Sequence, residues 1–420
     1  MPKSLQAWLK IIEGQHHTEV DLGLERSGKV FQRLFPDCTS PDQWPITTIT
    51  VAGTNGKGST VACLESLAIA ANLEVVSFTS PHLINYRERI RFQSEWLSEQ
   101  QHIESLSAIH EAAKDIPLTY FEYNTLSVLY WAYKLKPDLL LLEVGLGGRL
   151  DAVNLVAADI AIITTVDYDH QDFLGDSLEE IATEKLGVVH NNTSLILADD
   201  TVPQTCLIDL KAKDIFKNAN DFKLLDDDSW QWPDKNLGPF PIDTDLRPLT
   251  NIGAALAAFS ILYSDLLNER LVVEAINSIK ISGRFQKLLD SPQVYLDVAH
   301  NPQAIKNLVK RSELQTNKVH LVLGMLRDKN IVECLDLLSD VVSNWYICDI
   351  NLPRGCSAQE IKELMQQSAI SLTGVTCYSS VIKAYEAAYR VAEADSGLII
   401  VLGSFHTVGP VLELVNNDVK

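Results

Sequence analysis

The stretch from Ile46 to Thr60 reads ITTITVAGTNGKGST. Its first half is a β-branched run typical of a buried strand, and Gly53, Gly56 and Gly58 interrupt that run just before a helical pattern begins. In such a strand–turn–helix unit the backbone N–H groups and the helix N-terminus face a bound anion. The stretch therefore predicts an α/β fold whose first sheet binds a nucleotide.

The side chains of this turn match that ligand. Lys57 is placed to reach the terminal phosphates, and Ser59 or Thr60 offers a hydroxyl to magnesium. The strict Walker pattern is not met, because Val51 stands at the position of the first glycine and Gly58 follows the lysine. The alternative is an ordinary glycine turn without a ligand. The coincidence of glycines, lysine and hydroxyls at a helix start favours a nucleotide.

Outward from this turn, short apolar runs alternate with helical patterns, which predicts parallel βαβ units. Predicted strands in the first half lie at 46–53, 74–80, 138–145, 159–166 and 194–199, and predicted helices at 57–71, 120–135, 251–263 and 271–279. Five further runs begin at residues 294, 319, 344, 374 and 397, with helices beginning near Pro302, Asn330, Ser357 and Ser380. We expect two domains: residues 1–281 with helices on both faces of a P-loop-type sheet and a peripheral excursion at about 200–245, and residues 282–420 as a smaller Rossmann-like domain.

Composition limits the possible partners and surroundings. The 420 residues carry 35 Lys+Arg against 55 Asp+Glu, a net charge of −20, which argues against a nucleic acid or an anionic membrane surface as partner. The seven cysteines form no C-x-x-C motif, and no apolar run reaches the roughly 18 residues of a membrane span. A cytoplasmic protein is expected.

Charged residues follow several predicted strands of the first half. Glu143 ends a run of leucines and is placed to hold a cation, although the glycines after it also fit an ordinary solvated turn. His170 lies among aspartates, where it is either a metal ligand or a surface residue. Taken alone, Lys185 reads as a solvated helix residue. The arginines at 87, 89 and 91 either receive an anion or line one solvated face of a short strand.

Two further groups of residues are candidates. The aromatic run TYFEY at 119–123 either stacks on a planar ring or belongs to the core. In the second half, Arg284 is a candidate phosphate clamp and Asp297 a candidate ribose ligand, with an interdomain salt bridge as the alternative for both. His300 follows the same predicted strand as Asp297, the first strand of the second sheet. The turn GSFHT, which contains Ser404, is rich in hydroxyls.

The motifs taken together carry a resemblance. They are, in order, GTNGKGS, SPHL, TYFE, LEVGLGGRLDA, DH, EK, SGRFQ, LDVAHNP and GSFHT. This set resembles the folylpolyglutamate synthase and dihydrofolate synthase family of the Mur-ligase superfamily, and most closely its bacterial bifunctional type. The resemblance runs from Asp21 to the GSFHT turn. One departure is Ser282, where family members commonly have proline.

The resemblance implies a role for each matching residue. The implied ATP contacts are Thr54, Asn55, Gly56, Lys57, Gly58, Ser59, Asn251, Arg284 and Asp297. The implied magnesium ligands are Ser80, Glu143 and His170, and Lys185 matches a lysine found as a carbamate. The implied pterin-site residues are Asp21, Leu22, Gly23, Leu24, Thr119, Tyr120, Phe121, Glu122, Leu150, Asp151 and Ala152. His300 and Ser404 match the glutamate side, and the implied catalytic set is Lys57, Lys185, Arg284, Asp297 and His300.

The implied activity is an ATP-dependent ligation of L-glutamate to 7,8-dihydropteroate and to tetrahydrofolate through an acyl phosphate. ATP and two Mg²⁺ ions are the expected cofactors, and a monovalent cation is left open. The small-molecule substrates are the expected partners, with the protein acting as a monomer. The alternatives are a monofunctional folylpolyglutamate synthase and, from another class, a P-loop phosphotransferase or NTPase.

Overall fold

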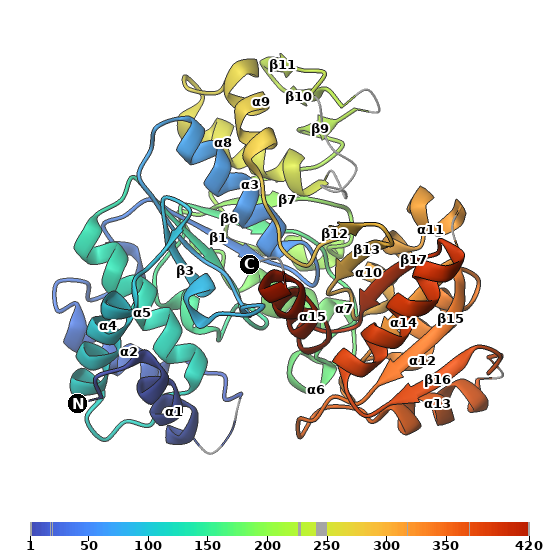
Figure 1. Ribbon diagram of the computed structural model, residues 1–420. Coiled ribbons are helices and arrows are strands. Elements are labelled where there is room, and N and C mark those ends of the chain that lie inside the picture. Colours follow the sequence, from blue (N-terminus) through green and yellow to red (C-terminus); the bar gives the residue numbers. More distant parts are fainter. Residues whose placement is uncertain are drawn as a thin grey trace. The chain divides into compact units, whose positions relative to one another are not determined.

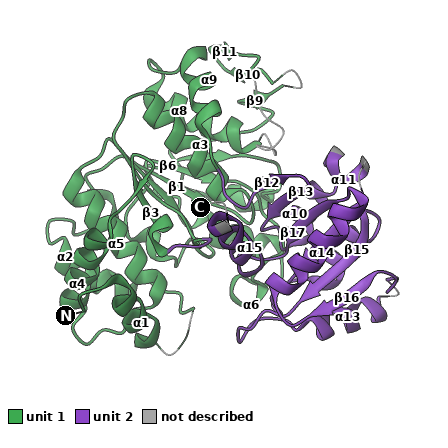
Figure 2. Cartoon of the chain, viewed as in Figure 1, with its two compact units in different colours: residues 1–82, 86–280 green, residues 83–85, 281–420 purple. Residues whose placement is uncertain are grey.

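The computed structural model describes residues 2–16, 18, 20–225, 228–240, 250–316, 318–368 and 370–418. The chain divides into two compact units, residues 1–82 with 86–280 and residues 83–85 with 281–420 (Figure 2). Each unit has its own mostly parallel sheet with helices beside it (Figure 1). The predicted α/β class with two separate sheets is confirmed. The short segment 83–85 belongs to the second unit, although it lies within the sequence of the first.

The helices of the first unit are α1 (Leu5–Gln15), α2 (Glu25–Leu34), α3 (Lys57–Ala70), α4 (Glu99–Ala113), α5 (Tyr120–Leu135), α6 (Gln171–Leu174), α7 (Leu178–Leu186), α8 (Thr250–Tyr263) and α9 (Glu269–Ser278). Its strands are β1 (Thr48–Ala52), β2 (Val75–Phe78), β3 (Ile90–Phe92), β4 (Glu95–Trp96), β5 (Leu139–Glu143), β6 (Ile160–Ile163), β7 (Ser194–Leu197), β8 (Asp214–Lys217), β9 (Lys223–Leu224), β10 (Trp230–Trp232) and β11 (Lys235–Leu237). Short 3-10 helices include η2 (Tyr86–Arg89) and η3 (Ala152–Leu155).

The large sheet of the first unit has the order β4-β3-β2-β5-β1-β6-β7-β8. Strands β2, β5, β1, β6, β7 and β8 pair in parallel, whereas β3 and β4 are antiparallel additions at one edge. β1 lies between β5 and β6, and Val51 pairs with Glu143. Because parallel strands end at one edge of the sheet, the turn after β1 and the carboxylate of β5 lie side by side.

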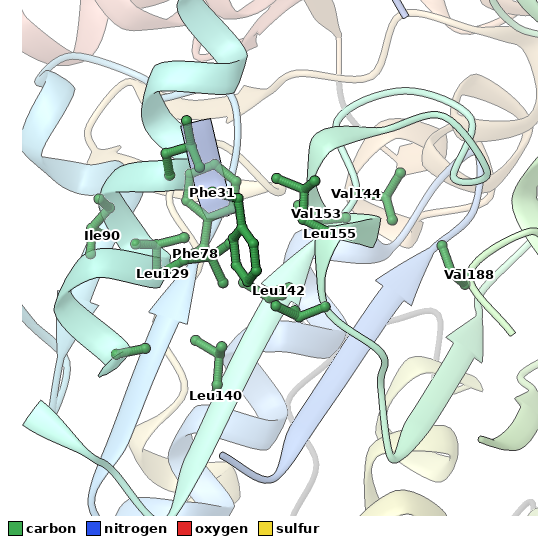
Figure 3. Packing of buried hydrophobic residues seen from close by; sticks show 14 of the residues in the cluster. Phe31, Phe78, Ile90, Leu129, Leu140, Leu142, Val144, Val153, Leu155 and Val188 are labelled. Atoms are coloured by element: carbon green, nitrogen blue, oxygen red, sulfur yellow. The ribbon is translucent and has the colours of Figure 1, made fainter. Parts of the chain in front are cut away.

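The leucine run of β5 is continuous because both faces of the sheet are covered. Leu140 and Leu142 join the hydrophobic cluster that includes Leu129 of α5, and Figure 3 shows these side chains near Phe78 of β2. The intervening residue Leu141 joins the opposite cluster, which is built with α3, α8 and α9. Packing on both faces thus fixes the position of each strand in the sheet. The candidate site residues at the ends of these strands are positioned in the same way.

The segment predicted as a peripheral excursion has two parts. β8 extends the large sheet at its edge, and β9, β10 and β11 form a small antiparallel sheet. Trp230 is fully buried and its ring stacks on that of Trp232 with centroids 5.8 Å apart. Residues 226–227 and 241–249 of this predicted excursion lie outside the described residues.

The second unit contains β12 (Gln286–Asp290), β13 (Gln293–Asp297), β14 (Val319–Leu323), β15 (Val342–Cys348), β16 (Val375–Tyr378), β17 (Leu398–Leu402) and the helices α10 (Pro302–Leu308), α11 (Ser312–Thr316), α12 (Ile331–Ser339), α13 (Ala358–Gln367), α14 (Val381–Asp395) and α15 (Phe405–Asp418). Its sheet order is β12-β13-β17-β14-β15-β16, with only β12 antiparallel among these strands. Hydrophobic clusters lie on both faces. Across the described parts of the chain, no helix has the length and apolar character needed to cross a membrane.

Candidate active site

The glycine turn between β1 and α3 is hydrogen-bonded to the loop after β6. Thr54 N donates to Thr165 O at 2.8 Å, and Asn55 N donates to the Thr165 hydroxyl at 3.0 Å. Gly53 has φ +144°, and a Cβ there would lie 1.9 Å from the Thr164 Oγ1 atom. Only glycine therefore fits at this point of the turn.

Lys57 and Asn251 meet the turn from two helices. Lys57 begins α3, and its Nζ donates to Gly53 O at 2.9 Å and to Thr54 O at 3.3 Å. Gly56 has φ +90°, and a Cβ there would lie 2.6 Å from the Oδ1 atom of Asn251, a buried residue in the first turn of α8. Gly56 and Asn251, two candidate ATP residues that are far apart in the sequence, are thus neighbours in the structure.

Glu143 lies at the same sheet edge. Its side chain is buried at the end of β5, and its Oε2 atom accepts a hydrogen bond from Ser80 N at 2.9 Å. Both carboxylate oxygens lie 3.6 Å from the position that a Cβ on Gly58 would take. The residues predicted as magnesium ligands at 80 and 143 are therefore adjacent to each other and to the first turn of α3.

His170 precedes α6 in a left-handed conformation, with φ 54°. Its side chain is partly exposed, and its Nε2 atom lies 3.9 Å from Asp169 Oδ2. Within the described ranges no group of three or more His, Cys, Asp and Glu side chains is arranged to hold a metal ion by itself.

Lys185 is not a solvated residue, in contrast to what its local sequence suggests. It lies on α7 with only 4% of its surface exposed. Burial is the largest cause of a lowered pKa, which falls from 10.5 to about 7. The positive charge of Lys57 contributes to this lowering, whereas Asp169 acts in the opposite direction. The amine is therefore substantially neutral near pH 7.

The candidate pterin residues come together through hydrogen bonds between distant segments. Gly23 N donates to Leu150 O at 3.1 Å, which joins the segment before α2 to the segment after β5. Thr119 and Glu122 form a capping box at the start of α5, with Thr119 N donating to Glu122 Oε2 at 2.7 Å. Arg26 Nη2 lies 3.4 Å from Glu122 Oε1.

The aromatic run at 119–123 has one fully buried ring and two partly exposed rings. Tyr123 is fully buried in the core, as the core interpretation requires. Tyr120 and Phe121 are partly exposed. The Phe121 ring leaves no space for a side chain at Gly145, whose Cβ would lie 2.5 Å from it, and Arg89 lies over the Tyr120 ring at 5.3 Å.

Asp151 organises the glycine turn after β5. Its Oδ2 atom accepts from Leu146 N at 2.9 Å and its Oδ1 atom accepts from Val153 N at 3.0 Å, so that it caps η3. Burial raises the pKa of this carboxyl to about 6, against the lowering effect of these hydrogen bonds. Ala152 is buried beside it, and Leu150 is half-buried.

The arginines at 87, 89 and 91 do not form one solvated strand face, so that interpretation is wrong. Arg87 and Arg89 belong to η2, and only Arg91 lies on β3. Arg91 pairs with the buried Glu65 of α3 at 3.0 Å, and Arg89 Nε donates to His82 Nδ1 at 2.8 Å. Arg91 has a partner on α3 because that helix packs against the sheet. The alternation of arginines in the local sequence does not reveal this partner.

In the second unit, Arg284 precedes β12 and Asp297 is the last residue of β13. Asp297 accepts hydrogen bonds from Phe285 N and Ala299 N, each at 2.8 Å. Burial raises the pKa of Asp297, whereas the positive charge of Arg284 lowers it. The guanidinium of Arg284 lies 5.8 Å from the centroid of the Phe405 ring.

His300 and Ser404 follow two neighbouring strands, β13 and β17, of the second sheet. His300 Nδ1 lies 2.9 Å from Val298 O, which orients the ring. The Ser404 hydroxyl is buried and accepts from Thr407 N at 3.2 Å at the start of α15. A structural role at the helix start therefore accounts for this hydroxyl without a ligand.

Comparison with known proteins assigns the family. Residues 51–231 match the Mur ligase middle domain, and residues 283–405 match the Mur ligase glutamate ligase domain. A protein of Escherichia coli (strain K12) named dihydrofolate synthase/folylpolyglutamate synthase is 37% identical over 418 residues, which cover 98% of this chain and 96% of that protein.

Two solved structures extend the comparison. E. coli FolC in complex with DHPP and ADP is 37% identical with a TM-score of 0.90, and the match covers 100% of both chains. A bifunctional folylpolyglutamate synthase/dihydrofolate synthase with Mn, AMPPNP and L-glutamate bound is 38% identical with a TM-score of 0.87, and covers 99% of this chain and 98% of that one. The resemblance drawn from the motifs is thus confirmed, and the chain belongs to the dihydrofolate synthase/folylpolyglutamate synthase family of Mur ligases.

Proposed function

We propose that this protein is an ATP-dependent ligase that joins L-glutamate to 7,8-dihydropteroate and to tetrahydrofolate. The observation that carries the proposal is the meeting of the glycine turn and the Glu143 carboxylate at one sheet edge, in a chain 37% identical to E. coli FolC. A carboxylate is a poor acyl donor, so the substrate's carboxylate oxygen attacks the γ-phosphorus of ATP. The products of this step are ADP and an acyl phosphate, whose phosphate then leaves when the amine of glutamate attacks.

The turn between β1 and α3 is the proposed ATP site. Thr54 N and Asn55 N donate to Thr165, so the backbone N–H groups proposed to face the phosphates are those at the N-terminus of α3. Lys57 hydrogen bonds to carbonyls of its own turn, so its ammonium group lies within the loop that would surround the phosphates. Asn251 is held against Gly56 and is the proposed nucleotide contact from α8. Relatives solved with ADP and with AMPPNP support this assignment.

The residues at this edge fit a divalent cation. Glu143 offers a buried carboxylate, and Ser80 and His170 add a hydroxyl and an imidazole. These three residues would hold magnesium together with oxygens of the nucleotide. When bound, the cation offsets negative charge on the phosphates during transfer.

Lys185 is the proposed carbamate. Carbon dioxide adds only to a neutral amine, and the lowered pKa of about 7 makes that form abundant at neutral pH. The addition forms an N–C bond and releases one proton, which converts the neutral amine into an anionic carbamate. A negative carbamate buried at this position would be attracted to the positive charges of Lys57 and of the bound cation, and would stabilise both.

Arg284 and His300 of the second unit are proposed to act on the transferring phosphate and on glutamate. The planar guanidinium matches phosphate oxygens in pairs, so Arg284 stabilises charge that develops during transfer. His300, oriented through Val298 O, would contact the amino acid. L-glutamate bound to a similar enzyme supports an amino-acid site in the family.

The decisive experiment measures phosphate release and product mass with ATP and L-glutamate present, with dihydropteroate or tetrahydrofolate as acceptor. The expected products are dihydrofolate and tetrahydrofolate extended by one glutamate. Phosphate release at full rate without glutamate would instead indicate a phosphotransferase or NTPase. Activity with tetrahydrofolate alone would indicate a monofunctional enzyme, and activity with neither acceptor would refute the proposal.

A further inference from the structure

Arg26 joins two parts of the proposed pterin site. It lies in the first turn of α2, and its Nη1 atom donates to Asp21 Oδ2 at 2.6 Å while its Nη2 atom donates to Asp21 O at 2.7 Å. The same Nη2 atom lies 3.4 Å from Glu122 Oε1 at the start of α5. One guanidinium therefore connects the segment between α1 and α2 to the capping box that presents Tyr120 and Phe121.

The position of Arg26 is not explained by its own helix. A cation in the first turn meets the positive end of the helix dipole, which is unfavourable. The reason for an arginine here is its tertiary partners. The Glu122 side chain is 4% exposed, and its Oε1 atom accepts no hydrogen bond in the described part of the chain, so the adjacent guanidinium offsets a buried charge.

The segment that Arg26 holds has no secondary structure to fix its orientation. Residues 20–24 form no regular element between α1 and α2. Besides Arg26, the polar contacts of this segment include the hydrogen bond from Gly23 N to Leu150 O and the approach of His16 Nε2 to Asp21 Oδ2 at 3.3 Å. Leu24 packs against the hydrophobic core of the first unit. The planar guanidinium of Arg26 donates to both the side chain and the backbone carbonyl of Asp21. Two hydrogen bonds from one rigid group fix the orientation of this segment as well as its position.

We infer that Arg26 is a positioning residue for the pteridine substrate, acting through Asp21 and Glu122 rather than on the reacting atoms. The inference rests on the proposed function. Arg26 lies in the first unit, and its hydrogen bonds and its ion pair join it to Asp21 and Glu122, two residues assigned to the pterin. Its loss should therefore weaken recognition of the pteridine while leaving ATP and glutamate recognition unchanged.

The test is steady-state kinetics of Arg26→Gln, with each of the three substrates varied in turn. The KM for dihydropteroate is expected to rise about tenfold, comparable to the loss of one hydrogen bond to a charged group. The KM values for ATP and glutamate, and kcat at saturation, should stay within about twofold of the wild type. Arg26→Lys keeps a positive charge beside Glu122 and should fold if Arg26→Gln does not, with an intermediate KM for dihydropteroate.

The matched control is Arg33→Gln. Arg33 lies on the same helix, but its Nη1 atom donates to Ala112 O and Ala113 O at the end of α4, away from the pterin segment. This variant should leave all three KM values unchanged. A general destabilisation of α2 would affect both variants alike, and that result would overturn the inference.

A double-mutant cycle separates positioning from direct contact. If Arg26 acts through Asp21, the Asp21→Asn/Arg26→Gln pair should raise the dihydropteroate KM no more than the worse single variant does. Additive effects would overturn the positioning role. An unchanged dihydropteroate KM in Arg26→Gln, with an active wild type, overturns this inference alone, whereas a wild type inactive with dihydropteroate overturns the proposed function itself.

Discussion

Replacement of Lys185 by methionine tests the chemistry proposed for the buried amine. The side chain is almost fully buried on α7, and methionine has a similar length without a charge. Burial and the positive charge of Lys57 hold the pKa of the amine at about 7. If the amine becomes a carbamate, Lys185→Met should remove a negative group that supports the cation site.

The magnitude follows from the fraction of neutral amine. At pH 7 a pKa of about 7 leaves about half of the amines neutral, whereas a lysine with a pKa of 10.5 has about 3 in 10,000 neutral. Burial therefore raises the reactive fraction by roughly a thousandfold. The loss of a group that supports a metal site typically lowers activity about 10- to 100-fold, which is the effect expected for Lys185→Met.

Lys185→Met should lower activity but raise the free energy of unfolding. The pKa of Lys185 is lowered on folding, so between about 7 and 10.5 the unfolded chain binds more protons, and its contribution to stability rises with pH. Below pH 7 the folded protein carries the buried charge in full. In buffer free of carbon dioxide, Lys185→Met should therefore be at least as stable as the wild type at pH 6, with the difference shrinking toward pH 9.

The assay is phosphate release with all substrates present, in buffers depleted of carbon dioxide or supplemented with bicarbonate, with unfolding by urea measured in parallel. Wild-type activity should depend on bicarbonate, and added acetate should partly restore the variant. Native mass spectrometry should detect one bound carbon dioxide in the wild type only. Lys29→Met is the control, since Lys29 is exposed on α2 and pairs with Glu25. Undiminished activity of Lys185→Met, or a wild type indifferent to bicarbonate, would refute the reasoning.

Three other substitutions test the rest of the site. Lys57→Ala should abolish phosphate release without unfolding the protein in circular dichroism, and near-normal ligation by this variant would contradict its phosphate role. Gly56→Ala places a Cβ 2.6 Å from Asn251 Oδ1 at φ +90°, so it should raise the KM for ATP and cost about 1–3 kcal/mol in urea unfolding, whereas Gly14→Ala, with nothing within 4 Å, should do neither. Arg284→Ala should lower kcat more than it weakens ATP binding measured by calorimetry, and equal losses would argue against a selective role in transfer.

Local sequence was sufficient for the elements whose periodicity is strong. The helix predicted at 120–135 is α5 (Tyr120–Leu135), and the leucine run at 138–145 contains β5 (Leu139–Glu143). Both predictions succeed because a strand covered on two faces is apolar throughout, and a helix start carries a capping box that can be read from Thr119 and Glu122.

Local sequence failed where partners come from elsewhere in the chain. The alternating arginines at 87–91 suggested a solvated strand face, yet Arg91 pairs with the buried Glu65 of α3. Lys185 looked solvated beside Glu184, yet it is buried. A charge pattern records the residues next in sequence, whereas burial depends on what packs against them after folding.

The sequence by itself determined the α/β class, the two sheets and the position of the glycine turn, because strand runs, helix starts and glycine turns depend on neighbouring residues. Only the tertiary structure decided that Asn251 lies against Gly56, that Ser80 N binds Glu143, and that Arg26 holds Asp21 beside Glu122. Strand order brings these distant residues to one edge or surface. Strand order is set by the packing of both sheet faces, which no local window of sequence contains.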